Sequence, residues 1–338
     1  MRTLVTGGSG FIGYHLVRRL RDLGDDVRCL VRQGSDVGFI DSLSVEFVYG
    51  DLRDVSSLER AVKGCDVVYH LAGRVRAISK RDFWVANCDG TKNLLNASIK
   101  SDSPPAFVYV SSIAAAGPSG NNLPKVETDV SLPITDYGLS KLSAERVIAD
   151  FCDRLPCSIV RPAIVFGGAD KMNLELYKTI KKLGICPVPG WRNSTYSWIH
   201  ATDLVELLIL TAKSGERVDA NVVDQINPTG KGLYFAAADE GTKLSDVGKM
   251  IGKSLGKRRT LILHCPPLTV LTLSTFYEIK KFLTGKNVPY DWSKATESKN
   301  NWCCSTKKAE TQLNFKVTTP IETRIHETTN WYTEHKWL

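Results

Sequence analysis

Three glycines near the start of the chain constrain its fold more than any other feature. They form the pattern G-x-x-G-x-x-G directly after a short apolar run and directly before a segment with helical periodicity. In a βαβ unit, such glycines permit a tight turn, close approach of a pyrophosphate and close packing of helix on strand, and the helix N-terminus offers N–H groups to phosphates. The pattern predicts a dinucleotide-binding loop whose contacts are Gly7, Ser9, Gly10, Phe11, Ile12 and Gly13.

Short β-branched runs alternate with helical segments through the first half of the chain, which indicates a parallel sheet with crossover helices. We expect strands at 4–5, 27–31, 45–49, 66–70, 106–110 and 157–160, and helices at 11–23, 55–63, 82–99 and 137–154. The predicted fold is α/β: a Rossmann-type doubly wound parallel sheet with a smaller, mostly C-terminal α/β substrate domain.

The alternation loosens after residue 166. Helices are expected at 173–183, 202–213, 245–255 and 318–337, with a connecting loop at 215–232. The predicted NAD(P)-binding domain covers residues 1–166, with 199–214 returning to it. Residues 167–198 and 215–338 are predicted to form the substrate-binding domain.

Composition excludes several classes of protein. The net charge of +8 is spread along the chain without a nucleic-acid-binding motif, so a solvated surface and no nucleic-acid partner are expected. The nine cysteines show no metal-ligand spacing, and no metal site is expected. Scattered cysteines, together with a strand and glycine turn that start at once, favour the cytoplasm and leave no room for a signal peptide.

The most apolar segment runs from Leu261 to Tyr277 and is interrupted by Pro266 and Pro267. We expect a loop followed by a helix that packs one apolar face into the core. Peripheral contact with a membrane surface is the less favoured alternative, because the lysines at 280, 281 and 286 follow immediately.

Arg32, which follows the second strand, and Asp51, which follows the third, bear on which cofactor is bound. An acidic residue at the end of the second strand would accept hydrogen bonds from the ribose of NAD, but this chain has Arg32 there. A guanidinium can pair with a 2′-phosphate, which favours NADP, with NAD as the alternative. Asp51 follows the third strand and is placed to accept from the adenine amino group.

Tyr137 and Lys141 are one helical turn apart, shortly after a strand that ends in Ser112. A nearby ammonium favours a phenolate, so Tyr137 is expected to exchange a proton with a substrate oxygen near neutral pH. The spacing Tyr-x-x-x-Lys occurs five times in the chain, and only this pair lies in the cofactor half.

The motifs Thr6-Gly-Gly-Ser-Gly-Phe-Ile-Gly13, Gly50-Asp-Leu52, His70-Leu-Ala-Gly73, Tyr137-Gly-Leu-Ser-Lys141 and Arg161-Pro-Ala-Ile-Val-Phe-Gly167 stand in this order. Together they resemble the extended short-chain dehydrogenase/reductases, also called the NAD-dependent epimerase/dehydratase family, strongly over residues 1–210. The resemblance implies an NAD(P)-dependent enzyme, a homodimer through the helices beginning near Asp82 and Tyr137, and a small-molecule substrate.

The resemblance also implies roles for individual residues. The catalytic residues would be Ser112, Tyr137 and Lys141, with Tyr137 and Lys141 also touching the cofactor and Asn87 supporting the site. His200 and Asp203 match a structural motif outside catalysis. Further cofactor contacts would be Leu52, Ala72, Gly73, Pro162 and Val165.

The segment after Arg161 is most similar to the dihydroflavonol-reductase, 3β-hydroxysteroid-dehydrogenase and hopanoid-associated branch of the family. The leading hypothesis is therefore hydride transfer between a secondary alcohol and a ketone, with a lipid-like or polycyclic substrate. A nucleotide-sugar epimerase is the second hypothesis, and a cofactor-binding regulator without catalysis is the third. Substrate contacts are expected in segments 79–84, 116–130, 167–198 and 260–300, with Arg192, Asn193 and Tyr196 as candidates.

Overall fold

The computed structural model describes residues 1–338 except 121–122, 191–192, 239–240 and 285–291. A parallel sheet, seven-stranded within these residues, forms the centre, in the order β11-β6-β5-β4-β1-β2-β3. The strand order reverses beside β1, which places a ligand crevice at the carboxyl ends of β1 and β4. The strands are β1 (Arg2–Thr6), β2 (Asp26–Val31), β3 (Glu46–Tyr49), β4 (Val67–His70), β5 (Ala106–Val110), β6 (Cys157–Pro162) and β11 (Leu233–Ala236).

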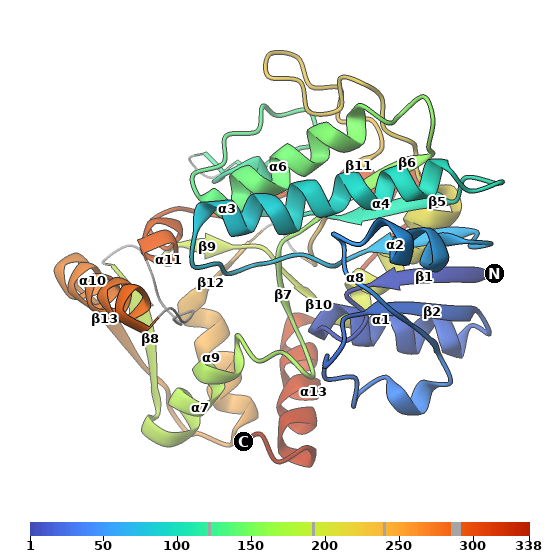
Figure 1. Ribbon diagram of the computed structural model, residues 1–338. Helices are drawn as coiled ribbons and strands as arrows, with labels where there is room; N and C mark the ends of the chain where they lie inside the picture. Colours follow the sequence, from blue (N-terminus) through green and yellow to red (C-terminus); the bar gives the residue numbers. More distant parts are fainter. Residues whose placement is uncertain (121–122, 191–192, 239–240, 285–291) are drawn as a thin grey trace.

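Helices cover both faces of the sheet (Figure 1). One layer contains α1 (Phe11–Asp22) and α8 (Ala201–Ser214), which pack on each other, with α12 (Lys307–Leu313) against α8 and β11. The other layer contains α2 (Val55–Val62), α4 (Gly90–Ile99) and α6 (Asp136–Ala149). The predicted α/β fold and doubly wound parallel sheet are confirmed.

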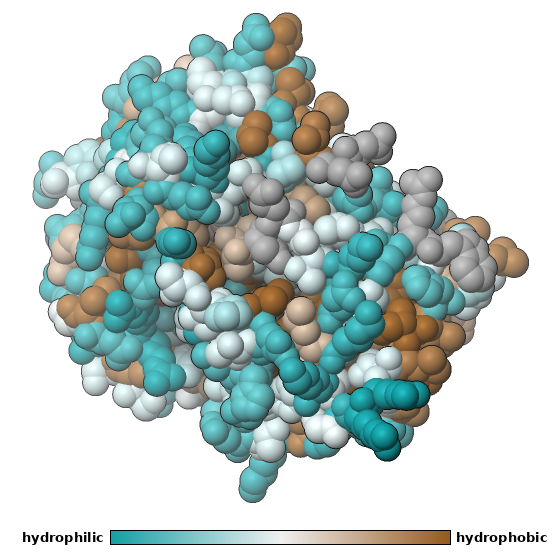
Figure 2. All heavy atoms as spheres, turned by 180° about the vertical axis from the view of Figure 1, so that it is seen from behind, coloured by the Kyte–Doolittle hydropathy of each residue, from teal (hydrophilic) through white to brown (hydrophobic). Residues whose placement is uncertain are grey.

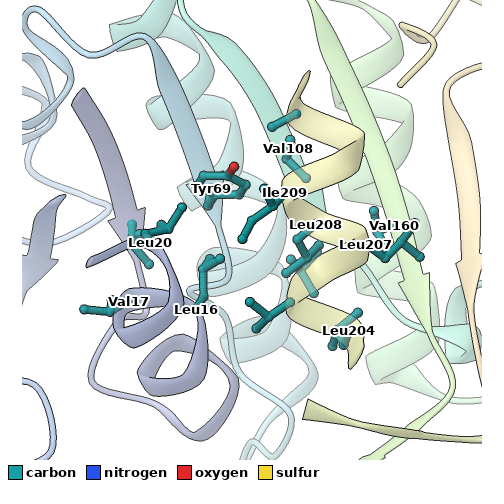
Figure 3. Close-up of a cluster of buried hydrophobic side chains, with 14 of the residues drawn as sticks. Leu16, Val17, Leu20, Tyr69, Val108, Val160, Leu204, Leu207, Leu208 and Ile209 are labelled. Carbon is teal, nitrogen blue, oxygen red and sulfur yellow. The ribbon is translucent and has the colours of Figure 1, made fainter. Parts of the chain in front are cut away.

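Burial of apolar side chains between these layers holds the sheet and helices together. Leu16, Val17 and Leu20 of α1 lie in one buried cluster with Leu204, Leu207 and Leu208 of α8 and with Val108 and Val160 of the sheet, and Leu16 points toward α8 (Figure 3). These side chains are at most 1% exposed, so each contributes about 1.5–3 kcal/mol of transfer free energy.

The expected helix over residues 82–99 contains an unexpected π-helical stretch. Residues 80–99 are helical throughout, as α3 (Lys80–Phe83), the π-helical segment η2 (Trp84–Asp89) and α4. Such widened turns redirect side chains and are frequent at functional sites. The buried Asn87 lies within this segment.

A smaller lobe packs beside the carboxyl ends of the central strands. Its helices are α7 (Leu174–Leu183), α9 (Leu244–Ser254), α10 (Pro267–Thr284), α11 (Trp292–Glu297) and α13 (Ile321–Glu334). Its strands pair in twos, β8 (Ile185–Pro189) with β13 (Leu261–Cys265) and β9 (Thr195–Tyr196) with β12 (Thr242–Lys243), while β7 (Ile164–Phe166) pairs with β10 (Trp198–His200). Among the described helices, none is long and apolar enough to cross a membrane.

Two expectations about residues 261–277 are wrong. Residues 261–265 form the strand β13 and not a loop, because their backbone pairs in parallel with β8. The core packing expected for 261–277 fails for Leu261 and Leu268, which are 62% and 71% exposed. In addition, β11 lies in the central sheet beside β6, although the sequence placed residues 215–338 in the substrate domain. The domain boundaries as a whole stay a prediction.

Candidate active site

The glycine loop lies between β1 and α1, and its shape depends on missing Cβ atoms. Gly7 has φ +77°, a conformation that favours glycine. A Cβ built at Gly7 would lie 2.8 Å from the backbone nitrogen of Ala72, so a larger residue does not fit there. A Cβ on Gly13 would lie 2.1 Å from the Gly7 carbonyl oxygen. Among the described side chains, none caps the N-terminus of α1 at Gly10. The loop and helix terminus therefore fit a pyrophosphate.

Ser9, Phe11 and Ile12 are half-buried at the same loop. Their placement at and beside the start of α1 puts their backbone N–H groups next to the glycine cradle. The six predicted loop contacts thus lie together, and their contact with a cofactor stays a prediction.

Arg32 and Asp51 are brought together after β2 and β3. Arg32 is exposed, and its charge is one of several that lower the pKa of Asp51. The larger cause is Arg53, whose Nε donates to Asp51 Oδ1 at 2.8 Å. Sequence reasoning missed Arg53, which adds a second guanidinium at the site expected to hold the adenosine. Leu52 is half-buried, with its carbonyl accepting from Asn93.

Asn87 joins the loop after β4 to α6, the helix that carries Tyr137 and Lys141. Its Oδ1 accepts from the Arg74 backbone N–H at 2.7 Å, and its Nδ2 donates to Ser140 Oγ at 2.9 Å. A Cβ built on Gly73 would lie 2.8 Å from Asn87 Oδ1, so Ala72 and Gly73 run close beside it. These hydrogen bonds place Asn87 between the two segments, and its supporting role in the site stays a prediction.

Ser112, Tyr137 and Lys141 converge at the carboxyl end of β5. Ser112 caps the short helix α5 (Ile113–Ala116), with its Oγ accepting from the Ala114 N–H at 3.1 Å. Burial raises the pKa of Tyr137 to about 12, while the nearby Ser112 hydroxyl opposes the rise. The phenol is therefore a protonated donor in the cofactor-free protein.

Lys141 is buried on the next turn of α6. Its Nζ donates to the Val110 carbonyl oxygen at 2.7 Å and lies 4.2 Å from the centre of the Tyr109 ring. Burial lowers the pKa of Lys141 to about 7, although the charge of Glu145 raises it. Desolvation therefore dominates the pKa of both groups, and the expectation that the ammonium favours the Tyr137 phenolate stays a prediction.

A buried ion pair behind the site was missed from the sequence. Arg161 and Glu145 have side chains 1% and 0% exposed, and their Nη2 and Oε2 atoms are 2.5 Å apart. Ser111 also donates to Glu145, and Arg161 donates to Ser131 at 2.8 Å. The network fixes α6 against the ends of β5 and β6, next to Ser112.

Pro162 and Val165 lie at and just after the carboxyl end of β6. Pro162 is buried at the end of β6, and Val165 pairs with Ile199 across β7 and β10. His200 and Asp203 take structural positions: His200 caps α8, and Asp203 forms a bidentate ion pair with Arg324 of α13.

Residues 301–304 form a bridging segment that sequence reasoning missed. Ser119 N–H donates to the Asn301 carbonyl at 2.9 Å, and Ser197 N–H donates to the Trp302 carbonyl at 2.8 Å. The bridging segment therefore joins the loop that follows Ser112 to β9 and its neighbours. Just before it, Glu297 lies close enough to Tyr137 for its charge to raise the pKa of the phenol.

Among the expected substrate contacts, Asn193 donates to Ser245 Oγ at 2.6 Å and Tyr196 packs edge-on against Trp198. Arg192 and Lys286 lie outside the described residues.

A glycine loop that fits a pyrophosphate lies beside half-buried Ser112 and Tyr137 and the buried Lys141. This is the arrangement of a nicotinamide-dinucleotide-dependent short-chain dehydrogenase/reductase site. The model of the NAD-dependent epimerase/dehydratase family matches residues 3–224. The chain belongs to this family, the extended short-chain dehydrogenase/reductases, whose members are NAD(P)-dependent enzymes.

Comparison with curated proteins gives three informative relatives. Sterol demethylase protein B of Methylococcus capsulatus is 31% identical over 66% of this chain and 69% of its own length. Sterol-4-alpha-carboxylate 3-dehydrogenase of Candida albicans is 27% identical over 98% of this chain and 97% of its own. An uncharacterised protein of Sinorhizobium fredii is 33% identical over 61% of this chain, a match that spans only 52% of that protein.

Solved structures share the fold at low identity. UDP-glucose 4-epimerase of Thermotoga maritima has a TM-score of 0.77 at 19% identity, covering 99% of this chain and all of its own. The dTDP-glucose 4,6-dehydratase of Bacillus anthracis has a TM-score of 0.78 at 18% identity, covering 100% of this chain and 98% of its own.

Proposed function

We propose that the protein interconverts a secondary alcohol and a ketone on a sterol-like or other lipid-like substrate, using NADP. The observation that carries this proposal is the proximity of Ser112 to Tyr137, one turn before the buried Lys141 and beside the glycine loop. This arrangement can hold a substrate oxygen and move a proton to it.

Each group of site residues has a separate role in the proposed reaction. Gly7, Gly10 and Gly13 would hold the pyrophosphate, and Pro162 and Val165 would contact the nicotinamide. When bound, the nicotinamide supplies or accepts the hydride. Ser112 holds the substrate oxygen, and the protonated Tyr137 donates to it in the direction of reduction. Lys141 holds the ribose and, when charged, stabilises the phenolate that remains. Burial of Lys141 keeps water from its ammonium group.

The substrate class rests on the relatives. Two of the similar proteins carry sterol-processing names, and a third, of Caulobacter vibrioides, is a ceramide reductase at 32% identity over 61% of this chain. These names belong to those proteins, and their extension to this chain is part of the proposal. A cytoplasmic location and a homodimer stay predictions from the sequence.

Replacement of Tyr137 tests the proton transfer. Tyr137→Phe should lower kcat on a panel of 3-hydroxysterols or their ketones by about 10²–10⁴-fold, with NADP affinity and Tm nearly unchanged, because the variant lacks only the hydroxyl. Tyr277→Phe is the matched control, since Tyr277 has the same spacing to a lysine outside the site.

Two results would contradict this mechanism. Full turnover by Tyr137→Phe would remove Tyr137 from catalysis. Conversion of a nucleotide sugar to its epimer, without net change in NADPH absorbance, would replace the alcohol–ketone proposal by the epimerase.

The cofactor preference is tested at Arg32. Arg32→Ala should weaken NADP binding by about tenfold or more and leave NAD binding unchanged, because only NADP carries the 2′-phosphate that the guanidinium would pair with. The exposed Arg146→Ala on α6 serves as control. Calorimetric titration with both cofactors measures the effect, and equal losses for NAD and NADP would contradict the assignment.

A further inference from the structure

Helix α10 carries apolar side chains on the face that points away from the protein. Val270 and Ser274 are buried, whereas Leu268, Phe276 and Leu283 are 71%, 61% and 75% exposed. At about 100° per residue, these three and Leu271 fall within an arc of about 140° opposite the buried pair. A surface helix ordinarily places polar residues there.

Strand β13 extends this surface. Leu261 and Leu263 are 62% and 48% exposed, while Ile262 between them packs into the core of the smaller lobe. Figure 1 places β13 beside α10, and Figure 2 shows apolar atoms gathered at the corresponding edge, on the right of that view. The apolar face is defined as Leu261, Leu263, Leu268, Leu271, Phe276 and Leu283.

The charge around the apolar face is mostly positive, although Glu278 lies on α10 between Phe276 and Lys280. From residue 254 to residue 277 the sequence contains three basic residues, Lys257, Arg258 and Arg259, and no acidic one. Arg258 and Arg259 are exposed directly before β13, and Lys280 is exposed on α10. Apolar side chains rimmed by cations match a bilayer, where acyl chains lie beneath anionic headgroups.

We propose that the apolar face docks onto the surface of a bilayer that contains anionic lipid. The helix lies along the interface with Leu268, Leu271 and Phe276 among the acyl chains, and Arg258 and Arg259 contact lipid phosphates. A second copy of the chain fits this face less well, because a twofold contact would bring the two sets of arginines together.

The location of the face gives docking a consequence for the site. Helix α10 packs against α11, which ends at Glu297 near Tyr137. Docking therefore holds the smaller lobe, beside the catalytic residues, at the membrane. Membrane docking does not depend on which reaction the protein catalyses, because it is tested by binding to vesicles and not by enzymatic activity.

Vesicle sedimentation of the full chain tests the proposal. The protein should sediment with phosphatidylcholine vesicles that contain phosphatidylglycerol, and less with phosphatidylcholine alone. Leu268→Asp combined with Phe276→Asp should lower the partition coefficient by about tenfold or more, because charged groups do not enter the acyl region. Arg258→Glu with Arg259→Glu should weaken binding to the anionic vesicles selectively.

Ile226→Asp is the matched control, since Ile226 is 79% exposed on a distant loop and should leave binding unchanged. The Leu268→Asp/Phe276→Asp variant and the Ile226→Asp control alter only exposed residues, and circular dichroism checks that both variants fold. The proposal is overturned if the parent chain stays in the supernatant, or if the double variant sediments like the control. A parent dimer that the double variant converts to monomer, without vesicle binding, would assign the face to a second copy instead.

Discussion

At the scale of single residues, burial controls the chemistry of the site. Tyr137 and Lys141 lie on consecutive turns of α6, as their spacing predicted, but their pKa values move apart to about 12 and about 7. The spacing of two residues identifies a shared helix face. It does not show how much water reaches that face, so the protonation states could not be predicted from the sequence.

Lys141 should give the protein a characteristic pH dependence. Its pKa in the folded protein lies below the usual 10.5, so between pH 7 and that value the unfolded chain binds more protons. The free energy of unfolding should therefore rise with pH from about 7 to 8.5, by up to about 1.4 kcal/mol per pH unit. Lys141→Met should remove this slope in urea denaturation.

The pH range must stay below the ordinary thiol pKa. Burial raises the pKa of Cys29 to about 12, from the usual 9.0, and this favours the unfolded chain above pH 9. The exposed Lys178→Met provides the control, and parallel stability curves for the parent and Lys141→Met would contradict the assignment.

At the scale of elements, α6 carries both the predicted catalytic residues Tyr137 and Lys141 and the buried carboxylate of Glu145. Tyr137 and Lys141 were identified because they follow a strand that ends in Ser112. The ion pair between Glu145, one turn further, and Arg161 on β6 was not identified. A separation of 16 residues between a helix acid and a strand arginine does not determine whether the two side chains meet. Their pairing depends on the crossover from α6 to β6, which only the structure shows.

Loss of the Glu145 charge should be costly. Glu145→Gln leaves the Arg161 guanidinium buried without a carboxylate, which typically lowers the free energy of unfolding by about 3–5 kcal/mol. Glu206→Gln breaks the half-exposed pair with Arg19, where about 1 kcal/mol or less is expected. Denaturant titration compares the two variants, and similar small losses would show that the buried network contributes little.

At the scale of the whole molecule, the strands and helices of the first half could be predicted because each has its own periodicity. Strand β11 and the bridging segment, residues 301–304, could not. Both are four residues long, and their partners are far away in the sequence, at β6 for β11 and at residues 119–125 and 195–197 for the bridging segment. Short segments paired over such distances carry no local signal.

Trp302 should couple the lobe to the site. Its side chain is 5% exposed and packs with Ile113, directly after Ser112, and with Tyr196. Trp302→Ala should lower the free energy of unfolding by about 3–5 kcal/mol and reduce kcat, because the α5 cap loses its packing. Trp302→Phe should restore most of both, and full activity in Trp302→Ala would separate the bridging segment from the site.

The bridging segment also bears on how substrate preference can be exchanged between related enzymes. Its backbone hydrogen bonds to residues 119–125 and to residues 195–197 make three distant stretches of chain one structural unit. Every residue except proline supplies these backbone groups, so a transplanted stretch keeps the hydrogen bonds only if it follows the same backbone path. A chimera that moves the three stretches together meets this condition most simply.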